Sequence, residues 1–138
     1  MDYQEILKEV SKNSYFFFAL ARLSFGKAKY EEALNYLSQI DHNDALRSSQ
    51  ARYLEIACYY EQQLPTEFIL DKCAAFTLFL NRKVKHLKEL SEGCKNFNKI
   101  VRDLLVNKST KMELLRVLEN QELIVFKQWL LEKINQKK

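Results

Sequence analysis

Residues 15–37 read YFFFALARLSFGKAKYEEALNYL, two helix-length segments joined at a tight turn. Bulky apolar residues recur three or four positions apart, as they do on one face of a helix. The first segment recurs at an offset of 36 residues, in the pairs Phe17 and Tyr53, Leu20 and Ile56, and Ala21 and Ala57. One hairpin of such a repeat cannot bury its own apolar face, so hairpins stack and leave an extended surface. The stretch therefore predicts a helical-repeat binding scaffold.

The composition favours an all-α fold. Two glycines and one proline among 138 residues leave little material for the turns of a sheet protein, and no run alternates apolar and polar residues. A chain of this length suits one domain. We therefore predict a single domain, residues 1–138, with about eight helices.

The helix boundaries in the first half follow from the apolar spacing. A short helix beginning near Tyr3 is expected to end at residues 12–14. The next should run over residues 15–25, and Gly26 marks the turn that follows it.

In the second half, an apolar stripe over residues 69–87 predicts the longest helix of the chain, broken at residues 91–93. Thr110 and Glu113 have the capping-box spacing, in which each side chain satisfies a free backbone N–H of the other residue. A helix should therefore start there, and another should carry the residues from Leu123 onward.

The chain has no apolar run near the ~20 residues that a membrane-crossing helix needs, so we expect a soluble, cytoplasmic protein without a membrane partner. Its three cysteines, Cys58, Cys73 and Cys94, are widely spaced and form no C-x-x-C or Cys/His pair. We expect reduced, buried thiols, no metal site and no cofactor.

The first hairpin resembles a tetratricopeptide repeat, on Phe17, Leu20 and Ala21 in its first helix and Tyr30 and Ala33 in YEEALNYL. The resemblance implies a right-handed superhelix of stacked antiparallel hairpins. The resemblance is good over residues 14–45. It is degenerate over residues 46–90, where Pro-Thr-Glu-Phe replaces the Tyr-x-x-Ala opening. Over residues 91–138, a helical cap, only the helical periodicity matches. The whole chain is similar to the carboxy-terminal part of helical-repeat proteins of Bacteroidota, judged from YEEAL, the acidic loop and FKQWLLEKI.

In such repeats the first helix of each hairpin lines a concave face that binds a partner. The resemblance implies that this face carries Tyr15, Phe18, Arg22, Phe25, Leu54, Lys95, Asn98 and Arg102. Aromatic anchors with a few cations suit a peptide that has apolar and acidic groups. The alternative for Phe18 and Phe25 is that both pack in the core.

Residues 82–111 form a basic segment with nine Lys or Arg and three Asp or Glu. Within it, Arg82, Lys85 and Lys88 lie about one helical turn apart. They could meet an anionic surface or nucleic acid. The alternative is a solvated helix face, since no nucleic-acid motif accompanies the charge.

The predicted function is that of a non-enzymatic interaction scaffold that binds a protein or peptide on its concave face. Two alternatives remain: an anionic-surface or nucleic-acid binder acting through residues 82–111, and a structural fragment of a larger protein or homo-oligomer. Self-association could use the last helix, where Leu131 and Ile124 add apolar surface near Trp129, although a Trp at this spacing more often closes the core of a capping helix.

Overall fold

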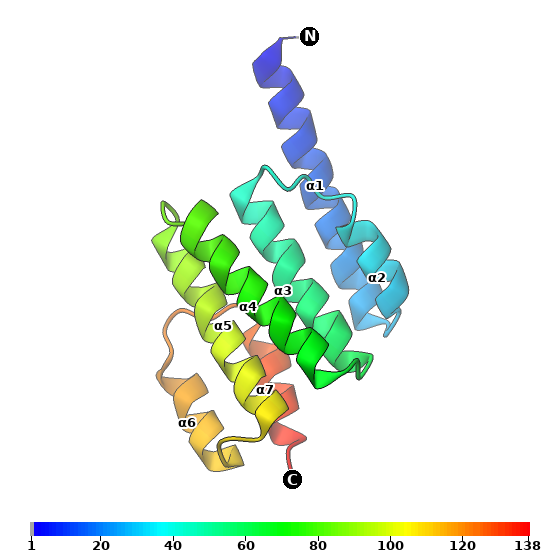
Figure 1. Cartoon of the computed structure of the whole chain (residues 1–138). Helices are drawn as coiled ribbons and strands as arrows, with labels where there is room; N and C mark the ends of the chain where they lie inside the picture. Colours follow the sequence, from blue (N-terminus) through cyan, green and yellow to red (C-terminus); the bar gives the residue numbers. More distant parts are fainter. Residues whose placement is uncertain (1) are drawn as a thin grey trace. The chain divides into compact units, whose positions relative to one another are not determined.

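The computed structural model describes residues 2–138, without the side chains of residues 3, 6–8, 10 and 11. The described residues form seven helices and no strand (Figure 1). The helices are α1 (Tyr3–Gly26), α2 (Tyr30–Leu37), α3 (Ala45–Glu61), α4 (Thr66–Lys83), α5 (Lys88–Val106), α6 (Lys111–Asn120) and α7 (Lys127–Asn135). The all-α class predicted from composition is confirmed.

The chain divides into two compact units, one ending at Leu64 and one running from Pro65 to Lys138. In the first, α1 and α2 form a hairpin, and α3 packs against both of them (Figure 1). Small residues lie at these helix contacts, since Ala21, Ala33 and Ala57 have no exposed surface. A larger side chain at such a position would overpack the contact at a cost of about 1–3 kcal/mol.

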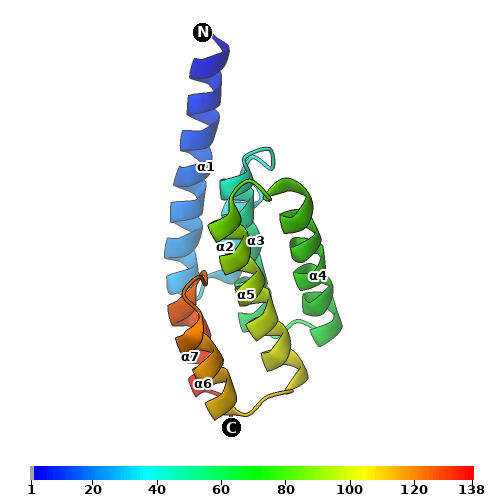
Figure 2. The same cartoon turned by 90° about the vertical axis from the view of Figure 1, so that its left-hand side faces the viewer.

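The predicted helix end at residues 12–14 is wrong, because α1 continues through it to Gly26. Figures 1 and 2 show the first part of α1 extending beyond the ends of α2 and α3. Ser14 is buried, and its hydroxyl oxygen accepts a hydrogen bond from the backbone N–H of Asp41 at 3.1 Å. The polar residue therefore holds the loop after α2 and does not end a helix. With 24 residues, α1 is also the longest helix, which was predicted to lie elsewhere.

The turn predicted after Gly26 is present. The backbone N–H of Lys27 donates to the carbonyl of Leu23, and Ala28 takes the left-handed conformation, with φ of 59°. Glycine is the usual residue there, because a Cβ is strained at positive φ. The hairpin is tied further by the buried Ser24, whose hydroxyl donates to the Glu32 carboxylate at 3.1 Å.

In the second unit, α4 and α5 lie side by side as a hairpin, while α7 contacts both α5 and α6 (Figure 1). The helix break predicted at residues 91–93 is wrong: α4 ends at Lys83, and α5 already begins at Lys88. Gly93 lies inside α5 because the chain before α7 passes close to it. Its carbonyl accepts from the backbone N–H of Val125 at 3.3 Å.

The predicted capping box at the start of α6 is confirmed. The Thr110 hydroxyl accepts from the N–H of Glu113 at 3.2 Å, and the Glu113 carboxylate accepts from the N–H of Thr110 at 3.1 Å. The helix expected from Leu123 starts later, at Lys127.

Trp129 is a core residue of the second unit, 5% exposed. Its ring stacks on Phe126, with centroids 5.6 Å apart, and lies 6.0 Å from the ring of Phe97 on α5. The neighbouring Leu130 is fully buried. These contacts favour the core role over the role of an interface anchor on α7.

Candidate functional site

The residues expected to share a concave face differ widely in exposure. Phe18 is 8% exposed and packs edge-to-face on Tyr53, and Leu54 is fully buried. Asn98 is 2% exposed, and its amide nitrogen donates to Thr77 Oγ1 at 3.0 Å. None of these three side chains offers a surface to a partner.

The other expected concave-face residues reach solvent to some degree. Tyr15 is exposed, and the Arg47 guanidinium lies over its ring, 4.8 Å from the centroid. Phe25 is half-buried against Tyr30, with ring centroids 5.4 Å apart. Arg22 is exposed on α1, and on α5 Lys95 is half-buried and Arg102 exposed.

The amphipathic helix α5 organises the candidate site. One side buries Cys94, Phe97 and Val101 in the second unit. The other side carries a row of cations spaced by three, four or seven residues: Lys88, Lys95, Lys99 and Arg102. At 1.5 Å per residue the row is about 21 Å long.

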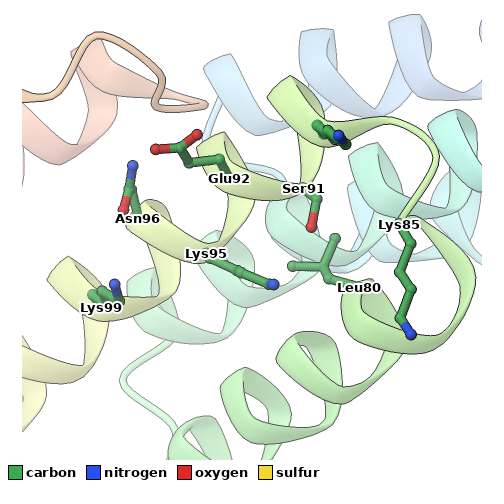
Figure 3. Close-up of a pocket in the computed structure, with 8 residues that line it drawn as sticks. Leu80, Lys85, Ser91, Glu92, Lys95, Asn96 and Lys99 are labelled. Atoms are coloured by element: carbon green, nitrogen blue, oxygen red, sulfur yellow. The ribbon is translucent and has the colours of Figure 1, made fainter.

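A first depression in this unit, the lysine pocket, has a volume of about 330 Å³. It is lined by Leu80, Lys85, Lys88, Ser91, Glu92, Lys95, Asn96 and Lys99. Figure 3 shows the Lys95 ammonium and the Ser91 hydroxyl turned toward Leu80, whereas the Glu92 carboxylate lies on the Asn96 side. The pocket therefore has one carboxylate and four lysines, and the carboxylate lies away from the Lys95 ammonium.

A second depression, the α4–α5 groove, has a volume of about 660 Å³. It is lined by Leu70, Asp71, Ala74, Lys99, Arg102, Asp103, Val106 and Lys108. Three of these residues are apolar and three are cations. Lys99 lines both depressions, so the groove and the lysine pocket adjoin on the same side of α5.

Asp103 keeps its negative charge in the groove, but both of its carboxylate oxygens already have hydrogen-bond donors in the loop after α5. Its two carboxylate oxygens accept hydrogen bonds from the backbone N–H of Ser109 at 2.9 Å and from the Ser109 hydroxyl at 2.7 Å. The carboxylate is thereby committed to the loop between α5 and α6. Charge-assisted hydrogen bonds of this kind are stronger than neutral ones.

Buried amides fix the helix that carries the cations. Asn96 Nδ2 donates to the carbonyl of Leu123 at 2.8 Å and to Gln121 Oε1 at 3.0 Å. On the α4 side, Asn98 Nδ2 also reaches the carbonyl of Cys73, at 3.4 Å. The row of cations therefore lies on a helix that hydrogen bonds hold in place on two sides.

The anionic-partner set predicted from sequence is brought together only in part. Lys85 and Lys88 line the lysine pocket, but Arg82, which is exposed in the last turn of α4, is not among its lining residues. Lys99 lies in the basic segment predicted from sequence, although it was not grouped with Arg82, Lys85 and Lys88. The sequence did not predict the contribution of the apolar Leu70 and Ala74, which α4 supplies to the groove.

The three thiols are free and buried, as expected for Cys58, Cys73 and Cys94. Burial is the largest cause that raises the pKa of each thiol to about 12. Among the described residues, no three His, Cys, Asp or Glu side chains gather where they could share a metal ion. Within residues 2–138, every helix falls short of the length and apolar content that a bilayer crossing requires.

Comparisons with known proteins give no further assignment. No family model, no curated protein and no solved structure matches the chain.

Proposed function

We propose that this chain is a non-enzymatic interaction module that binds an acidic protein segment along the cationic side of α5. The proposal rests on one observation: Lys99 lines both the lysine pocket and the α4–α5 groove, so the two depressions form one continuous surface. Together they present six cations, Lys85, Lys88, Lys95, Lys99, Arg102 and Lys108, against three carboxylates. Such a surface attracts anionic partners and orients them on approach.

A protein segment fits this surface better than a bare polyanion does, because the groove is partly apolar. Leu70, Ala74 and Val106 lie beside the cations, and Val106 is 54% exposed. An apolar side chain flanked by carboxylates could bury itself there while its neighbours meet Lys99 and Arg102. Buried apolar anchors commonly supply most of the energy of such interfaces.

We also propose that the fold is tetratricopeptide-like and that its hairpins stack as a right-handed superhelix. Support comes from the first unit, where α3 packs on both helices of the α1–α2 hairpin. The fully buried Ala21 and Ala33 stand at the small-residue positions of that repeat. Cytoplasmic location and a relationship to Bacteroidota repeat proteins belong to the same proposal.

The test is binding of a labelled peptide with one leucine between two runs of three glutamates, measured by fluorescence anisotropy. We expect Lys95→Glu/Lys99→Glu to weaken binding at least about tenfold, since the change reverses two charges at the centre of the surface. The matched control is Arg116→Glu/Lys127→Glu. It reverses two exposed charges on α6 and α7 that line neither depression. An equal loss in both variants would contradict the proposal.

Nucleic acid is the second candidate, and the row of cations on α5 is the observation that favours it. A single-stranded oligothymidine would bind with an affinity that falls by about 0.7 log units per log unit of salt for each phosphate neutralised. Tighter binding of the oligonucleotide than of the peptide at physiological salt, lost in the Lys95/Lys99 variant, would move the assignment to nucleic acid.

A further inference from the structure

Among the described side chains, α1 has more large exposed apolar residues than any other helix. Tyr15, Phe16 and Leu23 are 56%, 59% and 57% exposed. These values are high for large apolar residues that lie within three helical turns of each other. Apolar surface gathered in this way commonly marks an interaction site.

The exposed residues follow a helix-packing seam. Phe16, Ala19, Leu23 and Gly26 are all exposed and are spaced by three, four and three residues, which is the spacing that faces a second helix. Large and small residues alternate along this α1 seam. At Gly26 even an added Cβ would meet nothing within 4 Å, so a partner side chain has room there.

Within the length of the seam, the charged residues of α1 and its C-cap, Arg22 and Lys27, are exposed and have one sign. Toward the start of α1, the exposed Lys12 and then the exposed Glu9 continue the same spacing. The sequence holds no Asp or Glu from residue 10 to residue 30. A partner that covers the seam must therefore place anionic groups, or none, along its edges.

From the seam and its charges, we infer that α1 docks an amphipathic helix with an acidic border, with large partner residues opposite Ala19 and Gly26. Small partner residues would lie opposite Phe16 and Leu23. This site lies on a different helix from the cationic side of α5 and does not depend on the function proposed there.

A second copy of the chain fits the seam less well. Two α1 helices could alternate large and small residues in an antiparallel pair, but Lys12, Arg22 and Lys27 would then face a second set of cations.

A lipid surface fits less well for another reason. Basic amphipathic helices do bind anionic membranes, and their affinity grows with the apolar area that they insert. Ala19 and Gly26 reduce that area at two of the four seam positions. Small residues are, however, what a neighbouring helix needs for close approach.

The probe is a labelled 21-residue helical peptide with leucine and alanine alternating along one face and glutamate along both borders. We expect it to bind the full chain, measured by fluorescence anisotropy, and the same peptide with lysine borders to bind at least about tenfold more weakly. Phe16→Ser/Leu23→Ser should lower the affinity for the acidic peptide at least about tenfold. Met112→Ser/Val117→Ser, at two exposed positions on α6, is the matched control and should change binding less than about twofold.

Gly26→Leu separates a helix from a membrane, because it adds apolar surface but fills the space that a partner side chain would occupy. We expect Gly26→Leu to weaken binding of the acidic peptide. If anionic vesicles bind the chain, and bind this variant more tightly, the seam would instead be assigned to a lipid surface. Sedimentation equilibrium tests whether two copies of the chain associate through the seam. Self-association that Phe16→Ser/Leu23→Ser abolishes would overturn the acidic-helix assignment. Equal binding of the acidic and lysine-bordered peptides would overturn it as well.

Discussion

Gly93 on α5 touches Val125, 32 residues further along the chain: its carbonyl accepts the Val125 N–H at 3.3 Å, and a Cβ added to Gly93 would lie 3.4 Å from Val125 Cγ1. That distance is ordinary van der Waals contact. A methyl group therefore fits at Gly93, but a longer side chain does not. This contact sets how closely the segment before α7 approaches α5.

We expect Gly93→Ala to leave stability unchanged or to raise the free energy of unfolding by up to about 1 kcal/mol, because alanine has the higher helix propensity. Gly93→Leu should lower it by about 1–3 kcal/mol, because the added atoms overlap Val125. Urea denaturation followed by circular dichroism measures both. A leucine variant as stable as the alanine variant would show that the segment at Val125 moves away freely.

Ala28 offers a stabilising substitution, because it holds φ of 59° in the turn between α1 and α2. Glycine adopts this conformation without the cost of about 1–2 kcal/mol borne by other residues, but it gains entropy in the unfolded chain. We expect Ala28→Gly to raise the free energy of unfolding by about 0.5–1 kcal/mol. Thermal denaturation tests this, and Ala75→Gly, exposed within α4, is a control that should lower the melting temperature.

The capping box of α6 should make stability depend on pH. Hydrogen bonds from the Thr110 backbone and side chain are the largest causes that lower the pKa of Glu113 in the folded chain. A lowered pKa stabilises the folded state above the ordinary pKa of a glutamate, and this contribution disappears as the pH falls through the folded-state value. Glu113→Gln should therefore be less stable than the parent chain at pH ~7, and the difference should close in acid, below the lowered folded-state pKa of Glu113.

Thr110→Ala is the companion variant. It removes the other half of the box and should lower the free energy of unfolding by about 1 kcal/mol at neutral pH. Guanidinium denaturation at neutral pH and in acid measures the pair. A difference between Glu113→Gln and the parent chain that persists unchanged in acid would show that the carboxylate acts by something other than its charge.

Local sequence signals were sufficient where the partners of a residue are near it in the chain. The capping box at Thr110 and Glu113 joins residues three apart, and the turn after Gly26 joins neighbours. Both were predicted correctly. The break expected at residues 12–14 failed because Ser14 bonds to Asp41, 27 residues away, and no local pattern reveals that partner.

The candidate site divides in the same way. The row of Lys95, Lys99 and Arg102 on one helix can be read from spacing alone. The apolar part of the groove cannot be read in this way. Leu70 and Ala74 belong to α4, and they lie beside the cations only because α4 and α5 pack as a hairpin. The sequence alone does not decide whether Phe18 lies on the concave face or in the core, because its burial depends on Tyr53 in another helix.

The buried thiols should be nearly inert in the folded chain. With pKa values raised to about 12, Cys58, Cys73 and Cys94 are almost entirely protonated near pH ~8, and the thiolate is the reactive form. We expect Ellman's reagent to modify none of them within minutes in the native chain and all three at once in guanidinium. Stability should also fall as the pH rises above the unfolded-state pKa, because only the unfolded chain then ionises its thiols.

The apolar part of the α4–α5 groove should show itself as a preference for leucine in the acidic peptide. The parent chain is expected to bind the leucine-centred peptide about threefold to tenfold more tightly than a serine-centred one, since the leucine side chain loses its water against Leu70 and Val106. Val106→Ser should remove that preference and leave the affinity for the serine peptide unchanged, because Val106 is 54% exposed and carries no charge. Anisotropy titrations of both peptides measure the ratio; a ratio unaffected by Val106→Ser would place the leucine elsewhere and limit the surface to charge alone.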